Sequence, residues 1–316
     1  MIHTCEFYGI LENEIVGSLE ERFNTKITLI TEKIDTEKFN SVKFHFYKLY
    51  GVWRLNLVVD FIKLLNKNEI SENDYEEIEK RLEKIIIYLF GDMSKYVDII
   101  LKRIDFRKDV VIENKEEREL LLKIYKKARK KVNKKEKNTK FDSTIYFSNS
   151  SVVVIIYDKT KEREDKNLIV NEYEKNILRL EIRLFPKHLT YKKKSAKIER
   201  TLKSYLKNDI FSEYIDKHAL PILCQGNHYK IKFIESMLKE NDNIKAKDRK
   251  EIIKFLNYIS KYNFESVINK LDEKGKHKYS RYTCNKYMKI LTQLNINPLI
   301  IPSREAIDFI ENKFFI

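Results

Sequence analysis

The chain has 316 residues and a formal net charge of +15, with 42% hydrophobic and 12% aromatic residues. This composition is typical of a globular protein rather than a disordered one, and a mean hydropathy of −0.52 argues against a membrane protein. The longest apolar stretches, for example 85–90 and 151–157, are too short to cross a bilayer. The positive charge favours a nucleic-acid partner through counterion release, although a Lys-, Ile- and Asn-rich composition also arises in AT-biased genomes.

The organisation we expect is two domains, 1–207 and 208–316, because a chain of this length can bury one main core and a smaller second one. The first residues lack the basic and then apolar run of a secretory signal, so we expect a cytoplasmic protein. Its three cysteines, Cys5, Cys224 and Cys284, are far apart and odd in number. They predict neither a disulfide framework nor a zinc ribbon.

The first part of the chain is predicted to hold a strand meander followed by a helix. Runs of β-branched and aromatic residues at 25–31, 42–47 and 52–59 predict antiparallel strands. Apolar residues over 75–89 then keep helical spacing, and Gly91 suits the position just past the helix end.

The middle of the chain is predicted to continue the sheet. The second half of 97–111 alternates, as does 177–185, and each of these strands carries one apolar and one charged face. Segments 143–147 and 151–157 predict a hairpin whose second strand is apolar on both faces and therefore central.

The remaining segments are predicted to be helices and loops. Helical character is expected over 116–131, which ends in a basic run, and a charged loop is expected over 159–167. Helices follow Pro186 and dominate from residue 231 onward, where the pattern over 252–259 is clear.

Carboxylates on the two charged strands form a candidate metal site. Asp105 and Asp109 lie on one strand and Glu181 on the other, each among arginines. If the strands are neighbours with these faces on one side, the three carboxylates are suited to a hard cation such as Mg²⁺ or Mn²⁺, which polarises a phosphodiester. The alternative is a solvated face with ordinary cross-strand ion pairs.

A tyrosine at the end of the apolar strand is the candidate nucleophile. The sequence Tyr157-Asp158-Lys159 directs the phenol and the ammonium to the same face. A cation beside a phenol favours the phenolate, which tyrosine needs because its reference pKa is about 10.

These motifs occur in one order along the chain, at 101–109, 144–147, 155–163 and 178–182. The series resembles rolling-circle replication (Rep) proteins, in particular the Gram-positive plasmid Rep and relaxase group, which is related to the gene II/X replication proteins of filamentous phages. The resemblance extends from about residue 95 to residue 187 and weakens towards both ends.

The resemblance implies an α+β fold, with an antiparallel β-sheet nicking domain and flanking helices, plus a mainly helical C-terminal region. It implies that Tyr157 attacks DNA, that Asp105 and Glu181 bind Mg²⁺ or Mn²⁺, and that Asp109 occupies a further acidic position. The His-x-His pair of many related initiators is missing, and His45 fits a sheet residue better than a ligand. The expected enzyme is thus HUH-like without the histidine pair.

The implied reaction is nicking of single-stranded or cruciform origin DNA within a supercoiled duplex, through a 5′-phosphotyrosyl intermediate and without a nucleotide cofactor. Lys159 is expected to stabilise charge on the phosphate. Basic residues are expected to contact DNA, and the candidates are Arg103, Arg179, Arg183, Lys126, Lys127, Arg129, Lys130, Lys192, Lys193 and Lys194. A host helicase and a second copy of the chain are further candidate partners, and a membrane is not.

Two alternatives remain open from the sequence. One is a relaxase of a mobile element with the same chemistry, and the other is a non-enzymatic DNA-binding protein in which Tyr157 is a core aromatic. A separate expectation concerns the helix predicted over 282–294. It carries Tyr282, Tyr287 and Lys289, and it suits either a winged-helix-like origin reader or a helical cap.

Overall fold

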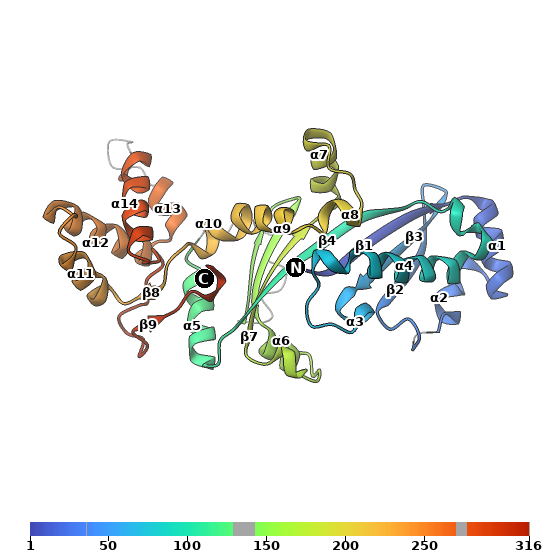
Figure 1. The fold of residues 1–316 in the computed structure, drawn as a ribbon, viewed down its shortest axis with the longest axis horizontal. Helices are drawn as coiled ribbons and strands as arrows, with labels where there is room; N and C mark the ends of the chain where they lie inside the picture. The colour runs from blue at the N-terminus through green and yellow to red at the C-terminus, as the bar shows by residue number, and fades with distance from the viewer. Residues whose placement is uncertain (36, 129–142, 270–276, 316) are drawn as a thin grey trace. The chain divides into compact units, whose positions relative to one another are not determined.

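The computed structural model describes residues 1–35, 37–128, 143–269 and 277–315 (Figure 1). Seven strands form one sheet in the order β2-β3-β1-β4-β7-β6-β5, and they are β1 (Ile2–Leu11), β2 (Val42–Leu49), β3 (Val52–Asp60), β4 (Ile99–Val111), β5 (Thr144–Ser148), β6 (Val152–Asp158) and β7 (Ile177–Leu184). With its flanking helices this sheet confirms the predicted α+β fold.

Antiparallel pairing is explicit around β1, which pairs with β3 on one side and β4 on the other, while β2 pairs with β3. Alternation decides which residues face the core: in β2, Val42, Phe44 and Phe46 are buried while Lys43 and His45 are exposed. β6 is buried along nearly its whole length, as expected for a strand with neighbours on both sides.

Two β-bulges interrupt the ladder between β1 and β4. Glu6 is opposite Arg103 whereas Phe7 is opposite Leu101, so Lys102 is an extra residue in β4. A second register shift lies between Ile2 and Thr4 of β1. A bulge turns two consecutive side chains towards the same face, which matters for the charged residues below.

The helices before residue 215 flank the sheet, and they are α1 (Asn13–Phe23), α2 (Ile30–Lys33), α3 (Phe61–Leu65), α4 (Tyr75–Phe90), α5 (Lys115–Tyr125), α6 (Lys159–Asp165), α7 (Pro186–Ala196), α8 (Leu202–Tyr205) and α9 (Asn208–Tyr214). α4 matches the helix predicted over 75–89, and Gly91 follows it with a φ of 55°. Phe39 connects α4 to the sheet, because its ring lies 4.5 Å from that of Tyr88 and 6.2 Å from that of Phe44.

The C-terminal part is mainly helical, as predicted, with α10 (Leu220–Leu223), α11 (Ile231–Glu240), α12 (Ala246–Lys261), α13 (Phe264–Asn269) and α14 (Arg281–Gln293), and with a two-stranded sheet of β8 (His228–Tyr229) and β9 (Phe309–Ile310). The apolar positions predicted for α12 form its buried side. Asn297, fully buried, donates from its side-chain amide to the carbonyls of Leu223 and Gly226 at 2.9 and 3.1 Å. This amide joins two distant segments of the C-terminal part.

Several local predictions are wrong. Segment 25–31 is not a strand but a 3₁₀ turn (Ile27–Leu29) followed by α2. Segment 159–167 is not a loop, because the side chain of Asp158 caps α6 by accepting from the amide of Lys161 at 3.0 Å. The helix expected over 116–131 ends at Tyr125.

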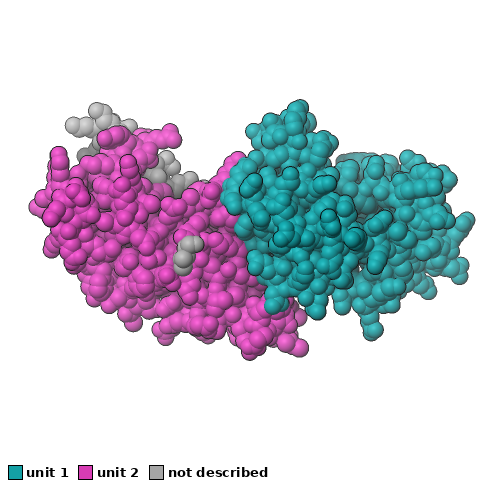
Figure 2. Space-filling view, in the orientation of Figure 1, with its two compact units in different colours: residues 1–107, 150–153, 181–214 teal, residues 108–149, 154–180, 215–316 magenta. Residues whose placement is uncertain are grey.

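The chain divides into two compact units, which Figure 2 colours separately: residues 1–107, 150–153 and 181–214, and residues 108–149, 154–180 and 215–316. The predicted division at residue 208 into two domains stays a prediction. Within the described ranges, none of the helices is both long and apolar enough to cross a membrane.

Candidate functional site

Charged side chains of β4 and β7 meet within the first unit. The Arg103 Nε donates to Asp105 Oδ1 at 3.0 Å. The guanidinium of Arg183 lies 3.5 Å from Asp105 Oδ2 and donates to Glu181 Oε2 at 2.7 Å. Asp105 and Glu181 therefore share one arginine. How near they lie to Tyr157, which belongs to the other unit, stays a prediction.

Glu6 of β1 extends this network, and its part was not predicted from the sequence. Its carboxylate accepts from Lys102 Nζ at 2.7 Å and from Arg103 Nη1 at 3.1 Å. Two consecutive residues of β4 reach the same carboxylate because the bulge at Lys102 turns both towards it. Lys102 also donates to Asn56 Oδ1 of β3 at 3.0 Å. We call these six charged residues, Glu6, Lys102, Arg103, Asp105, Glu181 and Arg183, the carboxylate network.

Burial disfavours the charged form of Asp105 within the carboxylate network. Asp105 and Glu181 are each only 2% exposed. Burial raises the pKa of Asp105 to about 6, the charges of Arg103 and Arg183 oppose this rise, and the negative charge of Glu181 adds to it. An additional positive charge next to this pair would therefore be favourable.

The predicted metal ligands do not all have the same surroundings. Asp109 accepts two hydrogen bonds from the guanidinium of Arg179, at 2.8 and 2.9 Å. Across the described residues, no group of three or more His, Cys, Asp or Glu side chains is placed to hold a metal ion. Asp105 and Glu181, which share Arg183, remain as a pair of candidate ligands, and metal binding by them stays a prediction.

In the second unit, Tyr157 and Lys159 lie where β6 passes into α6. The Lys159 Nζ is 5.9 Å from the centre of the Tyr157 ring. Asp158, between them, caps α6 and also accepts from Arg118 Nε at 2.7 Å in a buried ion pair. The strand end, the helix cap and this ion pair together fix the two flanking side chains.

Two carboxylates hold the Lys159 ammonium in place, at 2.7 Å from Glu162 and 3.4 Å from Glu174. Glu174 also accepts two hydrogen bonds from Arg163, at 2.9 and 2.7 Å. Burial alone would raise the pKa of Glu174, but Arg163 and Lys159 more than offset this and lower it to about 2. Nothing in the sequence indicated this support, because Glu174 lies 15 residues from Lys159.

Comparison of the sequence with protein families gives a match over the middle of the chain. Residues 68–209 match the family Phage_CRI, which is described as the N-terminal part of a replication-associated protein. Over these residues the chain is similar to that family. The resemblance to rolling-circle replication proteins is thereby confirmed, and the protein is placed in DNA replication. A search of curated proteins gave no match.

The segment shared with the replication-associated family contains most of the candidate site. Asp105, Tyr157, Lys159 and Glu181 lie inside it, whereas Glu6 of β1 lies before its first residue. All helices from α10 onward also lie outside it. Any role of the C-terminal helices must therefore be argued from their own residues.

The cations predicted to contact DNA in this replication protein have different environments. Arg179 is 1% exposed, and Lys192 is buried with its ammonium 2.8 Å from Glu213. These two cations are less accessible than the other candidates, and their contact with DNA stays a prediction. The exposed side chains are Lys126, Lys193 and Lys194, while Lys127 is half-buried and donates to the Ser260 carbonyl. Arg129 and Lys130 lie outside the described residues.

Proposed function

We propose that this protein initiates rolling-circle replication by nicking one DNA strand at an origin, with Tyr157 as the nucleophile. The observation that carries the proposal is the buried ammonium of Lys159 beside the Tyr157 ring, inside the segment that matches the replication-associated family. A positive charge held there stabilises both a phenolate and the negative charge that develops on an attacked phosphate.

The reaction exchanges one phosphodiester for another. The Tyr157 oxygen forms a bond to phosphorus while the bond between phosphorus and the 3′-oxygen breaks. The phenolic proton leaves to solvent, and the departing 3′-oxygen takes up a proton to become the primer hydroxyl. The 5′-phosphate stays on Tyr157, so the reverse reaction can rejoin the strand and no nucleotide is consumed.

Asp105 and Glu181 are the residues that we propose to hold a divalent cation, Mg²⁺ or Mn²⁺. When bound, such an ion would polarise the phosphodiester and neutralise charge on it. Asp109 is left out of this pair because Asp105 and Glu181 share Arg183, whereas Asp109 pairs with Arg179. The arginines of the carboxylate network orient Asp105 and Glu181.

The test uses supercoiled DNA of the protein's own replicon and the full chain. The wild type should convert the DNA to nicked circles and leave a covalent, protease-sensitive adduct at one mapped position. Tyr157→Phe removes only the phenolic oxygen, so binding should persist while nicking and the adduct disappear. Tyr146→Phe and Tyr191→Phe are matched controls that should still nick, because these tyrosines belong to β5 and α7 and not to the Tyr157-Asp158-Lys159 motif. An adduct formed by Tyr157→Phe would overturn the assignment.

A second candidate is a DNA-binding protein of the same fold without nicking activity. The observation in its favour is that Tyr157 is only 7% exposed, which also suits a core aromatic. In that case the wild type binds origin DNA but leaves it closed with Mg²⁺ or Mn²⁺ present. Tyr157→Phe then changes nothing that the assay measures.

A further inference from the structure

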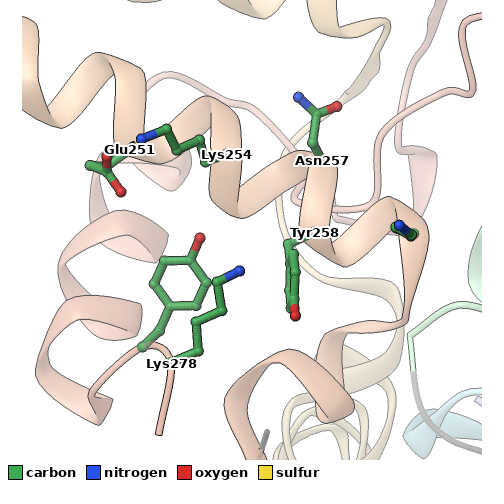
Figure 3. A pocket seen from close by; sticks show the side chains of 7 residues that line it. Glu251, Lys254, Asn257, Tyr258 and Lys278 are labelled. Atoms are coloured by element: carbon green, nitrogen blue, oxygen red, sulfur yellow. Dashed lines mark hydrogen bonds and ion pairs between the residues drawn. The ribbon is translucent and has the colours of Figure 1, made fainter. Parts of the chain in front are cut away.

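A cavity of about 570 Å³ lies on the C-terminal helices, between α12 and the residues just before α14 (Figure 3). The residues that line it are aromatic, basic or otherwise polar: Glu251, Lys254, Asn257, Tyr258, Lys261, Lys278 and Tyr279. We call this cavity the tyrosine pocket. Its volume is in the range of pockets that bind small molecules or single nucleotides.

Two tyrosine rings form the wall of the tyrosine pocket and are fixed by packing. The Tyr258 and Tyr279 ring centres are 6.4 Å apart, with an angle of 67° between the ring planes. The Phe255 ring centre is 5.2 Å from that of Tyr279, and the Tyr262 ring centre is 4.6 Å from that of Tyr258. A flat ligand that enters therefore meets aromatic surfaces that lose little conformational entropy on binding.

Lysines surround these rings. The ammonium of Lys278 lies 3.7 Å from the centre of the Tyr258 ring, and Figure 3 shows it directed towards that ring. Lys254 pairs with Glu251 at 2.7 Å, and Lys261 completes the rim. Three lysines and one glutamate leave a net charge of +2 around the pocket. This sign favours an anionic ligand.

The pocket lies at one end of a basic stripe on α12. Exposed polar residues recur along one side of this helix at spacings of three and four, and they are Lys247, Lys250, Lys254, Asn257 and Lys261. At 1.5 Å per residue the stripe is about 21 Å long. A row of cations that ends at an aromatic pocket is what a single strand requires, because its phosphates need charge and its unpaired bases need a surface for stacking.

We propose that the tyrosine pocket binds single-stranded DNA, with one base stacked on Tyr258, beside the buried Tyr279, and the flanking phosphates on the lysines of the pocket and stripe. On binding, the base takes the place of the Lys278 ammonium over Tyr258, and this ammonium moves to a phosphate. A duplex keeps its bases stacked inside, so it would engage the lysines alone. The inference rests on the proposed role in replication but not on Tyr157 as nucleophile.

The test measures binding of the full-length protein to a fluorescein-labelled oligothymidylate of roughly 20 nucleotides by fluorescence anisotropy. Tyr258→Ala should raise Kd about 5- to 150-fold, the range observed when a base-stacking aromatic is removed. Tyr258→Phe keeps the ring and should bind within about twofold of the wild type. Lys278→Glu, at an exposed position, should also weaken binding and serves if Tyr258→Ala fails to fold.

The outcomes separate this inference from the proposed nicking. Equal losses for the oligothymidylate and for a duplex of the same length would overturn base stacking, and unchanged affinity in both Tyr258→Ala and Lys278→Glu would overturn the site. With the wild type, an oligonucleotide carrying 5-iododeoxyuridine should photocross-link at Tyr258 or Tyr279, and cross-links confined to other residues would also overturn it. Tyr157→Phe should bind single strands normally, so a failure to nick leaves this result unaffected.

Discussion

The carboxylate network and the basic stripe of α12 use the same kinds of cation in opposite ways. In the network, Lys102, Arg103 and Arg183 each lie within 3.5 Å of a carboxylate on the sheet. Along the stripe, Lys247, Lys250, Lys254 and Lys261 are exposed to solvent on one helix side, and of these four Lys254 also pairs with a carboxylate, that of Glu251 at 2.7 Å. The first arrangement orients carboxylates, whereas the second suits a polyanion from outside.

A net charge of +15 therefore does not reveal which cations meet DNA. Arginines next to carboxylates on a strand pair with those neighbours, and Arg179 and Lys192 are buried in the same manner. Lysines that recur at helical spacing on an exposed helix side stay accessible to a ligand. Substitutions on the two sides of this division should accordingly have different effects.

Asp105→Asn should lower the nicking rate by roughly a hundredfold, the usual size for losing one electrostatic contact in an active site. Asp109→Asn is the matched control, because its carboxylate is held by Arg179 and should matter for stability instead. Nicking rates measured over a range of Mg²⁺ concentrations check this. If Asp109→Asn loses metal dependence as strongly as Asp105→Asn, then a three-carboxylate site replaces the proposed pair.

Arg179→Met should destabilise the fold by about 3 to 5 kcal/mol, because it removes the buried guanidinium that donates to Asp109. Lys193→Met, which removes a surface ion pair with Glu199, should cost much less. Urea denaturation of both variants measures the difference. A small loss for Arg179→Met would mean that Arg179 is not a structural cation, and its DNA-binding role would have to be reconsidered.

Replacing the four stripe lysines, Lys247, Lys250, Lys254 and Lys261, with Gln should flatten the dependence of single-strand affinity on salt. The slope of log Kd against log salt should fall by about 0.7 for each lysine that contacts a phosphate. Lys192→Gln should leave the slope unchanged, since Lys192 is buried against Glu213. Anisotropy titrations at several salt concentrations decide between these outcomes.

Glu174→Gln should have the smallest effect, on the order of 1 kcal/mol, because the amide oxygen of Gln can still accept a hydrogen bond from Arg163 and only the charge is lost. The pKa of Glu174 is lowered from 4.5 to about 2 in the folded protein, so its contribution is complete above pH 4.5 and is lost as pH falls towards 2. The variant should therefore be less stable than the wild type at pH 7 and lose less stability in that acidic window. Thermal melts over this pH range measure it, and parallel curves would contradict it.

Local sequence patterns predicted the strands and helices whose apolar residues recur with a regular period. Alternation located β4 and β7, and helical spacing located α4 and α12. β1 escaped notice because Gly9 and the bulged region near Ile2 weaken its alternation. Asp158 shows a different failure: as a helix cap it makes α6 possible, but its neighbours resemble a charged loop.

For the candidate site, the sequence predicted residues on individual β-strands but not the contacts between distant strands. Asp105 and Glu181 were assigned to one site, and the structure joins them through Arg183. Glu6 was missed because its contact with Lys102 spans 96 residues and depends on a bulge. Long-range pairing of this kind leaves no periodic signal in the sequence.

The bulge at Lys102 also bears on how this strand tolerates insertions and deletions. Without Lys102, Leu101 and Arg103 would be adjacent, point to opposite faces and keep their partners Phe7 and Glu6, so the ladder would become regular. A deletion here should therefore remove one cation while leaving the neighbouring pairs in place. Position 102 is therefore a place on β4 where relatives of this chain should tolerate a one-residue gap.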